Sequence, residues 1–311
     1  MKKYKIVFFG SPEFAIPSLE ALYENEDLKA VVTQSDKPKG RGLKPSPSPV
    51  KAWALSKGLK VLEPLKLKDP QFVETIKSFS PDLIVVCAYG KIIPKELLEI
   101  PKFGCWNIHA SLLPKYRGAS PINWVILEGE KETGVTIMLM DEGLDTGPIL
   151  LQKKIEISEK DTAITLSQKL AQLGKEAILE AIELHKKGQL KPVDQPEEGI
   201  SWTPILKKED GFFTFEEPAK IIERKVRAFL PWPTAYTYYK NKLLKIFSAK
   251  TVSFHHNEKP GTILDISKEG ILVATSEDAI LLKEVQLEGK KKISAYEFAC
   301  GQRFKKGDLL E

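Results

Sequence analysis

The first half of the chain alternates short apolar runs with amphipathic stretches. Four runs have the length and apolar content of buried strands: Ile6–Phe9, Ala30–Thr33, Leu83–Val86 and Gly134–Met140. After the first run, Ser11 and Pro12 are expected to provide the N-cap and the first position of a helix. The inner face of that helix is predicted to carry Ala15, Leu19 and Leu22. Strands that alternate with helices predict a doubly wound, mostly parallel, Rossmann-like α/β sheet.

Two further helices are predicted from their boundaries and periodicity. Ser120-Pro121 opens one helix, which Gly129 closes. A longer helix is expected from Asp161 to His185. Its inner side is predicted to carry Ile164, Leu170, Ala171 and Ile178.

The character of the sequence changes near residue 188. The stretch Gly188–Pro204 combines Gly, Pro and acidic residues with little periodicity, which indicates a linker. We expect this linker to be packed, because Ile200, Trp202 and Ile205 are apolar side chains that favour burial.

A small β-domain is predicted after the linker. A helix over Pro218–Phe229 comes first. Five short runs then have strand character: Ala235–Tyr239, Leu243–Ala249, Gly261–Ile266, Ile271–Thr275 and Ala279–Val285. They predict a small, OB-like β-barrel. The expected domains are therefore a catalytic domain (1–188), a linker (189–207) and a C-terminal barrel (208–311).

Composition narrows the class of protein without indicating a reaction. The 311 residues favour about two domains, and an apolar share of 42% with a charged share of 29% is ordinary for a soluble globular protein. The formal charge of +5 permits an anionic partner but does not by itself predict nucleic-acid binding. The N-terminal apolar run ends at Gly10, too early for a signal peptide, and no run approaches the ~18 apolar residues of a membrane span. We therefore expect a cytoplasmic protein.

The residues disfavour metal, disulfide and dinucleotide chemistry. The cysteines, Cys87, Cys105 and Cys300, form no Cys-x-x-Cys pair, and no histidine stands at ligand spacing from them. The turn Gly10-Ser11-Pro12 lies where a dinucleotide-binding loop would, but it lacks the glycine fingerprint and Pro12 has no N–H to donate. A dehydrogenase is therefore disfavoured, although a carboxylate or phosphate could still approach this helix N-terminus.

Two polar segments carry the candidate chemistry. Asn107 and His109 are two residues apart, so on a strand they would point to the same side and could both donate to one oxyanion. A glycine-rich loop at Met140–Pro148 holds the carboxylates Asp141, Glu142 and Asp145. We expect this loop at the carboxyl end of a parallel strand, where open α/β sheets bind ligands. Taken alone, the histidine could be an ordinary core residue and the loop a solvated turn.

Two longer motifs resemble a known family. The runs HASLLPKYRGASPINWVILEGE and GVTIMLMDEGLDTGPIL are similar to the core of the 10-formyltetrahydrofolate-dependent formyltransferases. The resemblance implies that Asn107, His109 and Asp145 are catalytic. It also implies folate contacts from Val86, Ala88, Tyr89, Gly90, Ser111, Leu112, Leu113, Pro114 and Asp141. One departure is Ala110, where the family often has Gly.

The implied reaction moves a formyl group from N10 of 10-formyltetrahydrofolate, a co-substrate, to an amine. Asn107 and a protonated His109 would stabilise the oxyanion that forms when the amine attacks. Asp145 would accept, through water, the proton that the amine loses. An α-amine titrates near ~7.7–8.0, so part of it is neutral at physiological pH and no metal is required.

The resemblance extends over nearly the whole chain and is closest to the family members that act on methionyl-tRNA. The segment Lys37–Pro49 is expected to be a loop that enters the acceptor-stem end of the initiator tRNA, with Arg41 leading. Its cations are Lys37, Lys39, Arg41 and Lys44. From composition alone, this segment could equally be a solubilising surface loop.

Basic clusters in the second half are candidate tRNA contacts. They are Arg224-Lys225-Arg227, Lys290-Lys291-Lys292 and Arg303-Lys305-Lys306, of which Lys290, Lys291 and Lys292 are the preferred contacts. Three alternatives stay open: the same transfer to glycinamide ribonucleotide or an amino-sugar nucleotide, a nucleic-acid-binding protein whose α/β domain is inert, and a dehydrogenase. The family resemblance favours a monomer.

Overall fold

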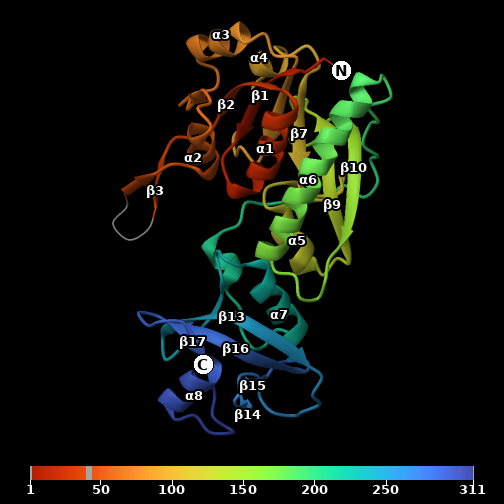
Figure 1. Cartoon of the computed structure of the whole chain (residues 1–311). Coiled ribbons are helices and arrows are strands. Elements are labelled where there is room, and N and C mark those ends of the chain that lie inside the picture. The colour runs from red at the N-terminus through yellow and green to blue at the C-terminus, as the bar shows by residue number, and fades with distance from the viewer. Residues whose placement is uncertain (1, 40–43, 311) are drawn as a thin grey trace. The chain divides into compact units, whose positions relative to one another are not determined.

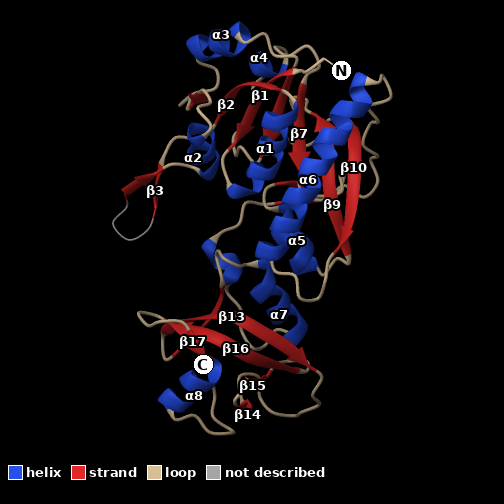
Figure 2. Ribbon diagram, viewed as in Figure 1, coloured by secondary structure: helices blue, strands red, loops and turns tan. Residues whose placement is uncertain are grey.

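The chain divides into two compact units. A computed structural model describes residues 2–39 and 44–310. The first unit comprises 1–121, 132–156 and 167–203, and the second comprises 122–131, 157–166 and 204–311. Figures 1 and 2 show the helices and strands of each. Within the described ranges, no helix combines the length and apolar character that crossing a membrane requires.

The first unit is built on a seven-stranded sheet in the order β10-β9-β7-β6-β1-β2-β5. The strands are β1 (Lys5–Gly10), β2 (Asp27–Val32), β5 (Val61–Leu62), β6 (Leu83–Cys87), β7 (Cys105–His109), β9 (Glu132–Leu139) and β10 (Ile149–Glu156). The five strands from β5 to β7 are parallel, while β9 and β10 run antiparallel to their neighbours. The predicted mostly parallel α/β sheet is thereby confirmed.

Helices cover both faces of this sheet. Figure 1 views it from the side of α1 (Ile16–Asn25) and α6 (Ala163–Lys186). On the other face, α3 (Pro70–Ser78) and α4 (Lys95–Leu98) pack against a cluster from alternate strand positions. Every residue of β6 is buried, because a parallel strand between two helical layers has no solvent face.

Two expectations about helices are wrong. Ser11 does not cap α1, because its Oγ accepts hydrogen bonds from Thr33 Oγ1 and from the Gln34 N–H, both at 3.2 Å. A short 3₁₀ turn follows it, and α1 begins only at Ile16. In α6, Ile164 is 41% exposed. Ala163 and Leu166 are buried in its place, on the same helical stripe as Leu170.

The stretch from 188 to 204 is held differently from what we expected. Ile200, Trp202 and Ile205 are exposed, not packed. The segment is fixed by backbone pairing, because β11 (Trp202–Thr203) runs parallel to β8 (Arg117–Gly118). Polar pairing, and not apolar burial, therefore orders this part of the chain.

The basic segment after β2 is partly regular in its described portion. β3 (Lys37–Lys39) and β4 (Lys44–Ser46) form an antiparallel ribbon where we expected a loop without secondary structure. Ser48 then caps α2 (Pro49–Ser56) by accepting a bond from the Lys51 N–H at 3.0 Å. Arg41 lies outside the described residues.

The second unit is an antiparallel sheet with flanking helices. Its sheet runs β12-β13-β16-β15-β14, with β17 paired to β16. The elements are α5 (Pro121–Glu128), a 3₁₀ turn (Lys208–Gly211), α7 (Ala219–Ala228), β12 (Ala235–Tyr239), β13 (Lys242–Val252), β14 (Ile263–Ser267), β15 (Gly270–Ala274), β16 (Ala279–Leu287), β17 (Ile293–Ser294) and α8 (Ala295–Gln302). All five predicted strands and the predicted helix α7 are confirmed.

Helix α8 was not predicted from the sequence. A signal was present, because Ser294 and Glu297 form a capping box in which each side chain bonds the backbone N–H of the other. Phe298 and Ala299 of this helix are buried in the core of the second unit.

Candidate active site

Strand β7 positions two of the three predicted catalytic side chains. Trp106 and Ile108 point to one face of the sheet, so Asn107 and His109 share the other. Asn107 is half-buried, and the side chain of His109 is only 6% exposed. The predicted common orientation of the amide and the imidazole is therefore confirmed.

The third side chain reaches the site by a route that we did not expect. β9 is antiparallel to β7, so its end at Leu139 lies beside Trp106, near the start of β7. The loop after β9 therefore begins at the opposite end of β7 from His109, and not at the carboxyl end of a parallel strand. It then carries Asp145 back to Asn107, so that the site lies along the face of β7.

The trio meets within contact distance. Asn107 Nδ2 donates to Asp145 Oδ1 at 3.4 Å, and His109 Nδ1 lies 3.6 Å from Asp145 Oδ2. The backbone N–H of Gly118 also donates to Asp145 Oδ2, at 2.8 Å. The structure thus brings the amide and imidazole of β7 together with a carboxylate that lies 38 residues after Asn107 in the sequence.

The second nitrogen of His109 fixes the direction of the ring. Nε2 lies 2.9 Å from the carbonyl oxygen of Tyr116. A carbonyl only accepts hydrogen bonds, so Nε2 carries a proton and donates it. Nδ1 is therefore the nitrogen that faces Asp145 and the reacting atoms.

Unusual backbone conformations gather around the trio. Ala88, Tyr116 and Asp145 have positive φ angles of 49°, 60° and 53°. Non-glycine residues take such angles rarely, and they concentrate at functional sites. Gly118 has φ 100°, and a Cβ at this position would stand 2.7 Å from the carbonyl oxygen of Thr203. Only glycine therefore lets this backbone approach both Thr203 and Asp145.

The segment Val86–Gly90, the predicted folate wall, alternates between buried and exposed residues. Ala88 and Gly90 are exposed beyond the end of β6. Val86 is buried, and Tyr89 points into the core, where its ring lies 5.3 Å from that of Phe9. Burial raises the pKa of Tyr89 to about 12, so its hydroxyl stays neutral. Tyr89 can therefore support this wall but does not offer its hydroxyl to a ligand.

Side-chain hydrogen bonds hold the backbone of the segment Ser111–Pro114. Ser111 is fully buried, and its hydroxyl donates to the Lys115 carbonyl at 2.7 Å. Thr136 Oγ1 donates to the Ser111 carbonyl at 2.7 Å. Gln152 Nε2 donates to the Leu113 carbonyl at 2.8 Å. Thr136 and Gln152 were not singled out in the sequence, where no motif distinguishes them from other strand residues.

Asp141 shapes its own loop. Its Oδ1 accepts bonds from the Gly143 N–H at 3.0 Å and from Thr146 Oγ1 at 2.7 Å. Glu142 pairs with Lys95 at 2.9 Å. Both carboxylates are exposed and outside the trio.

Two thiols lie near the site but are unsuited to catalysis. Burial raises the pKa of the Cys105 thiol to about 12 and raises that of Cys87 further still. Neither is therefore a thiolate at neutral pH. Across the described ranges, no group of three or more His, Cys, Asp or Glu side chains could hold a metal ion.

The predicted tRNA contacts differ in their availability. Lys290 and Lys291 are exposed, whereas Lys292 pairs with Glu284 at 3.0 Å. The cluster in α7 is engaged within the second unit: Arg224 bonds the Glu128 carbonyl, Lys225 pairs with Glu217, and Arg227 pairs with Glu223. This cluster therefore has a structural role that its charge alone did not reveal.

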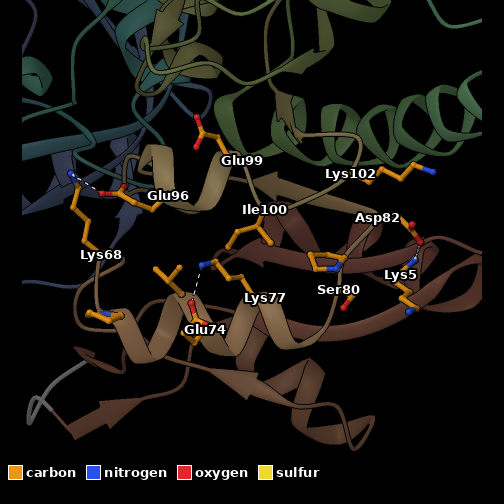
Figure 3. A pocket seen from close by; sticks show the side chains of 13 residues that line it. Lys5, Lys68, Glu74, Lys77, Ser80, Asp82, Glu96, Glu99, Ile100 and Lys102 are labelled. Carbon is orange, nitrogen blue, oxygen red and sulfur yellow. Dashed lines mark hydrogen bonds and ion pairs between the residues drawn. The ribbon is translucent and has the colours of Figure 1, made fainter.

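A hollow of about 1060 Å³ lies elsewhere in the first unit (Figure 3). Lys5, Asp82 and Lys102, at or just before the starts of β1, β6 and β7, help to line it. Lys77 and Glu74 pair within it at 2.8 Å. The hollow is thus at the amino ends of the parallel strands, away from His109, and its mixed charges indicate no ligand.

Comparisons with known proteins identify the family. Residues 4–182 match the "Formyl transferase" family, and residues 205–303 match "Formyl transferase, C-terminal domain". A methionyl-tRNA formyltransferase of Caldanaerobacter subterraneus is 49% identical over 309 residues, which cover 99% of this chain and all of the relative. A second, from Myxococcus xanthus, is 48% identical and covers 99% of this chain and 98% of the relative.

Solved structures share the fold at lower identity. HypX from Aquifex aeolicus in complex with tetrahydrofolic acid has a TM-score of 0.65 at 20% identity; all of this chain aligns, and it spans about half (51%) of HypX. A methionyl-tRNA formyltransferase from Clostridium thermocellum has a TM-score of 0.57 at 19% identity, over 91% of this chain and 98% of that one. With its trio assembled and both domain families matched, the chain belongs to the formyl transferase family, among the methionyl-tRNA formyltransferases.

Proposed function

We propose that this protein transfers the formyl group of 10-formyltetrahydrofolate to the free α-amino group of methionyl-tRNA, which yields N-formylmethionyl-tRNA for translation initiation. The observation that carries the proposal is the meeting of Asn107, His109 and Asp145 within 3.4 and 3.6 Å in a chain of this family. No thiolate or metal is needed for this transfer.

The geometry supports a direct attack of the amine on the formyl carbon. Asn107 Nδ2 and His109 Nδ1 both face Asp145, so a formyl oxygen placed between the amide and a protonated His109 would receive two hydrogen bonds as its negative charge develops. Asp145 is the acceptor for the proton that the amine loses, directly or through one water. Because Gly118 already donates to Asp145, the carboxylate keeps its orientation while it does so.

The folate donor would lie against the segments Val86–Gly90 and Ser111–Pro114, with Asp141 at the loop beside them. These residues fit a flat, partly polar ring, because Ala88 and Gly90 expose backbone groups and the braced Ser111–Pro114 segment is rigid. In this proposal, the donor is a co-substrate that leaves as tetrahydrofolate.

The acceptor is the initiator tRNA, held by its acceptor-stem end. The proposed contacts are Lys37, Lys39, Arg41 and Lys44 in the segment after β2, and Lys290, Lys291 and Lys292 in the second unit. In this proposal, residues 1–188 catalyse, 189–207 connect and 208–311 bind tRNA, and the enzyme works as a cytoplasmic monomer. Light scattering after gel filtration measures the molar mass and so tests whether the enzyme is a monomer.

A direct assay tests the function. The protein is incubated with 10-formyltetrahydrofolate and methionyl-tRNA, and the ester-linked amino acid is released and analysed for N-formylmethionine. Free methionine, glycinamide ribonucleotide and an amino-sugar nucleotide are offered in parallel. Formylation of methionyl-tRNA alone supports the proposal. Preference for glycinamide ribonucleotide or the amino-sugar nucleotide would assign the same chemistry to another substrate.

A further inference from the structure

Gln195 stands out in a segment that otherwise faces solvent. Every other residue from 191 to 200 is exposed, but Gln195 is half-buried. The sequence indicates only a linker at this point, and Gln195 belongs to none of the motifs discussed above. A partly buried amide needs partners for its two N–H donors and its carbonyl oxygen.

The amide of Gln195 bridges two segments of the active site. Its Oε1 accepts hydrogen bonds from Arg117 Nε at 3.1 Å and from Arg117 Nη2 at 2.7 Å. Its Nε2 donates to the carbonyl oxygens of Asp145 at 2.9 Å and Gly147 at 2.7 Å. Both donors and both acceptor positions of the amide are therefore in use.

These contacts close a ring around the catalytic carboxylate. Arg117 is 7% exposed, and the next residue, Gly118, donates its N–H to Asp145 Oδ2 at 2.8 Å. Gln195 therefore holds the backbone of Asp145 on one side and, through Arg117, the donor to its carboxylate on the other. Asp145 needs such support, because its φ of 53° lies in a region that non-glycine residues rarely occupy.

We propose that Gln195 is a positioning residue for formyl transfer, which holds the carboxylate of Asp145 in register with Asn107 and His109. The inference rests on the function proposed above. The four hydrogen bonds of Gln195 go to the Arg117 guanidinium and to the backbone carbonyls of Asp145 and Gly147, and not to a side chain of the trio. Its effect should therefore pass through Asp145 and appear in turnover more than in substrate binding.

Two variants separate the two sides of the bridge. Gln195→Met keeps the length of the side chain and removes all four bonds, while Gln195→Glu keeps the acceptor for Arg117 and removes the two donors. We expect both to lower kcat about 10- to 100-fold, the scale on which small displacements of catalytic groups act. KM for each substrate should change less than about threefold. Glu197→Ala, an exposed change in the same segment, should match the parent.

A double-mutant cycle shows whether the effect passes through Asp145. In an Asp145→Ala background, Gln195→Met should lower the residual kcat by less than about twofold, because coupled groups are not additive. A parental kcat in Gln195→Met, or a full additional loss in the Asp145→Ala background, would overturn the inference.

Hydrogen exchange gives a readout that does not depend on activity. We expect amides in residues 116–120 to exchange faster in Gln195→Met than in the parent without any substrate, because the Gly118 N–H loses its fixed acceptor. Unchanged exchange there would also contradict the inference. If the parent does not formylate methionyl-tRNA, the proposed function is wrong, while this measurement still decides whether Gln195 orders the loop. Gln195→Glu supplies the same comparison if Gln195→Met does not fold.

Discussion

Single side chains in the trio have separable duties. Asn107 has an amide donor and no titratable proton, so in the proposed mechanism it stabilises the oxyanion. We expect Asn107→Ala to lower kcat about 10²- to 10³-fold, the usual loss of one oxyanion donor. Steady-state kinetics measure the loss. The dissociation constant of tetrahydrofolate should stay close to that of the parent, and a parallel collapse of folate binding would reassign Asn107 to binding.

In the proposed mechanism, Asp145 accepts the proton and does not contact the oxyanion. We expect Asp145→Ala to lower kcat about 10²- to 10⁴-fold, the range of general base catalysis. His109→Ala should fall in a similar range, because it removes the imidazole from the same site. Single-turnover formylation at saturating substrate measures the chemical step. Parental single-turnover rates in Asp145→Ala would remove this carboxylate from proton transfer.

At the scale of elements, the end of α6 carries a half-buried histidine. His185 Nδ1 lies 2.9 Å from the Tyr4 hydroxyl, and its ring packs against Phe103 and Trp106. Burial lowers the pKa of His185 below its usual value, so the folded state favours the neutral ring. The unfolded chain therefore binds more protons below about pH 6.5, and the stabilisation is lost as pH falls.

We therefore predict that the stability of the folded state falls more steeply with decreasing pH in the parent than in His185→Gln. We expect the urea midpoint of the parent to fall more between pH 7.5 and 5.5 than that of His185→Gln, which has no group to protonate. Fluorescence-monitored denaturation at both pH values measures the difference. Parallel pH profiles for the two proteins would show that His185 does not contribute to the acid sensitivity.

The N-terminus of α8 is capped by the hydroxyl of Ser294. Ser294 Oγ accepts a bond from the Glu297 N–H at 3.1 Å. Ser294→Ala should lower the free energy of unfolding by about 1 kcal/mol, the usual contribution of an N-cap. Urea denaturation measures the change, with Ser253→Ala at an exposed serine of the same unit as the control. A loss of equal size in both variants would contradict the capping role.

At the scale of the whole molecule, tRNA binding by two units should depend strongly on salt. The double variant Lys290→Ser/Lys291→Ser should reduce the slope of log Kd against log salt by up to about two, because each lost phosphate contact removes roughly 0.7–0.9 from it. Filter binding of methionyl-tRNA across a salt series measures the slope. Lys2→Ser/Lys3→Ser is the matched charge control. Equal slopes in both variants would remove the 290–291 turn from the interface.

The sequence alone determined central strands of both units and indicated which chemistry is present. Continuous apolar runs such as Leu83–Val86 predicted buried strands, because their physical cause is local composition. The two-residue spacing of Asn107 and His109 predicted a common orientation, because strand periodicity is also local. The C-terminal strands followed from the same reasoning, and the family motifs identified the reaction.

Only the tertiary structure decided how distant segments meet. Periodicity does not reveal that β9 runs antiparallel to β7, so it could not predict that Asp145 reaches the trio across the face of that strand. Ser11 was predicted to cap a helix, but its hydroxyl instead accepts a long-range hydrogen bond from the Gln34 N–H. Gln195 shows most clearly what local sequence pattern cannot predict, since its four hydrogen bonds go to residues 48 to 78 positions away. Local pattern fixes what each segment is, while contacts of this kind arise only once the chain has folded.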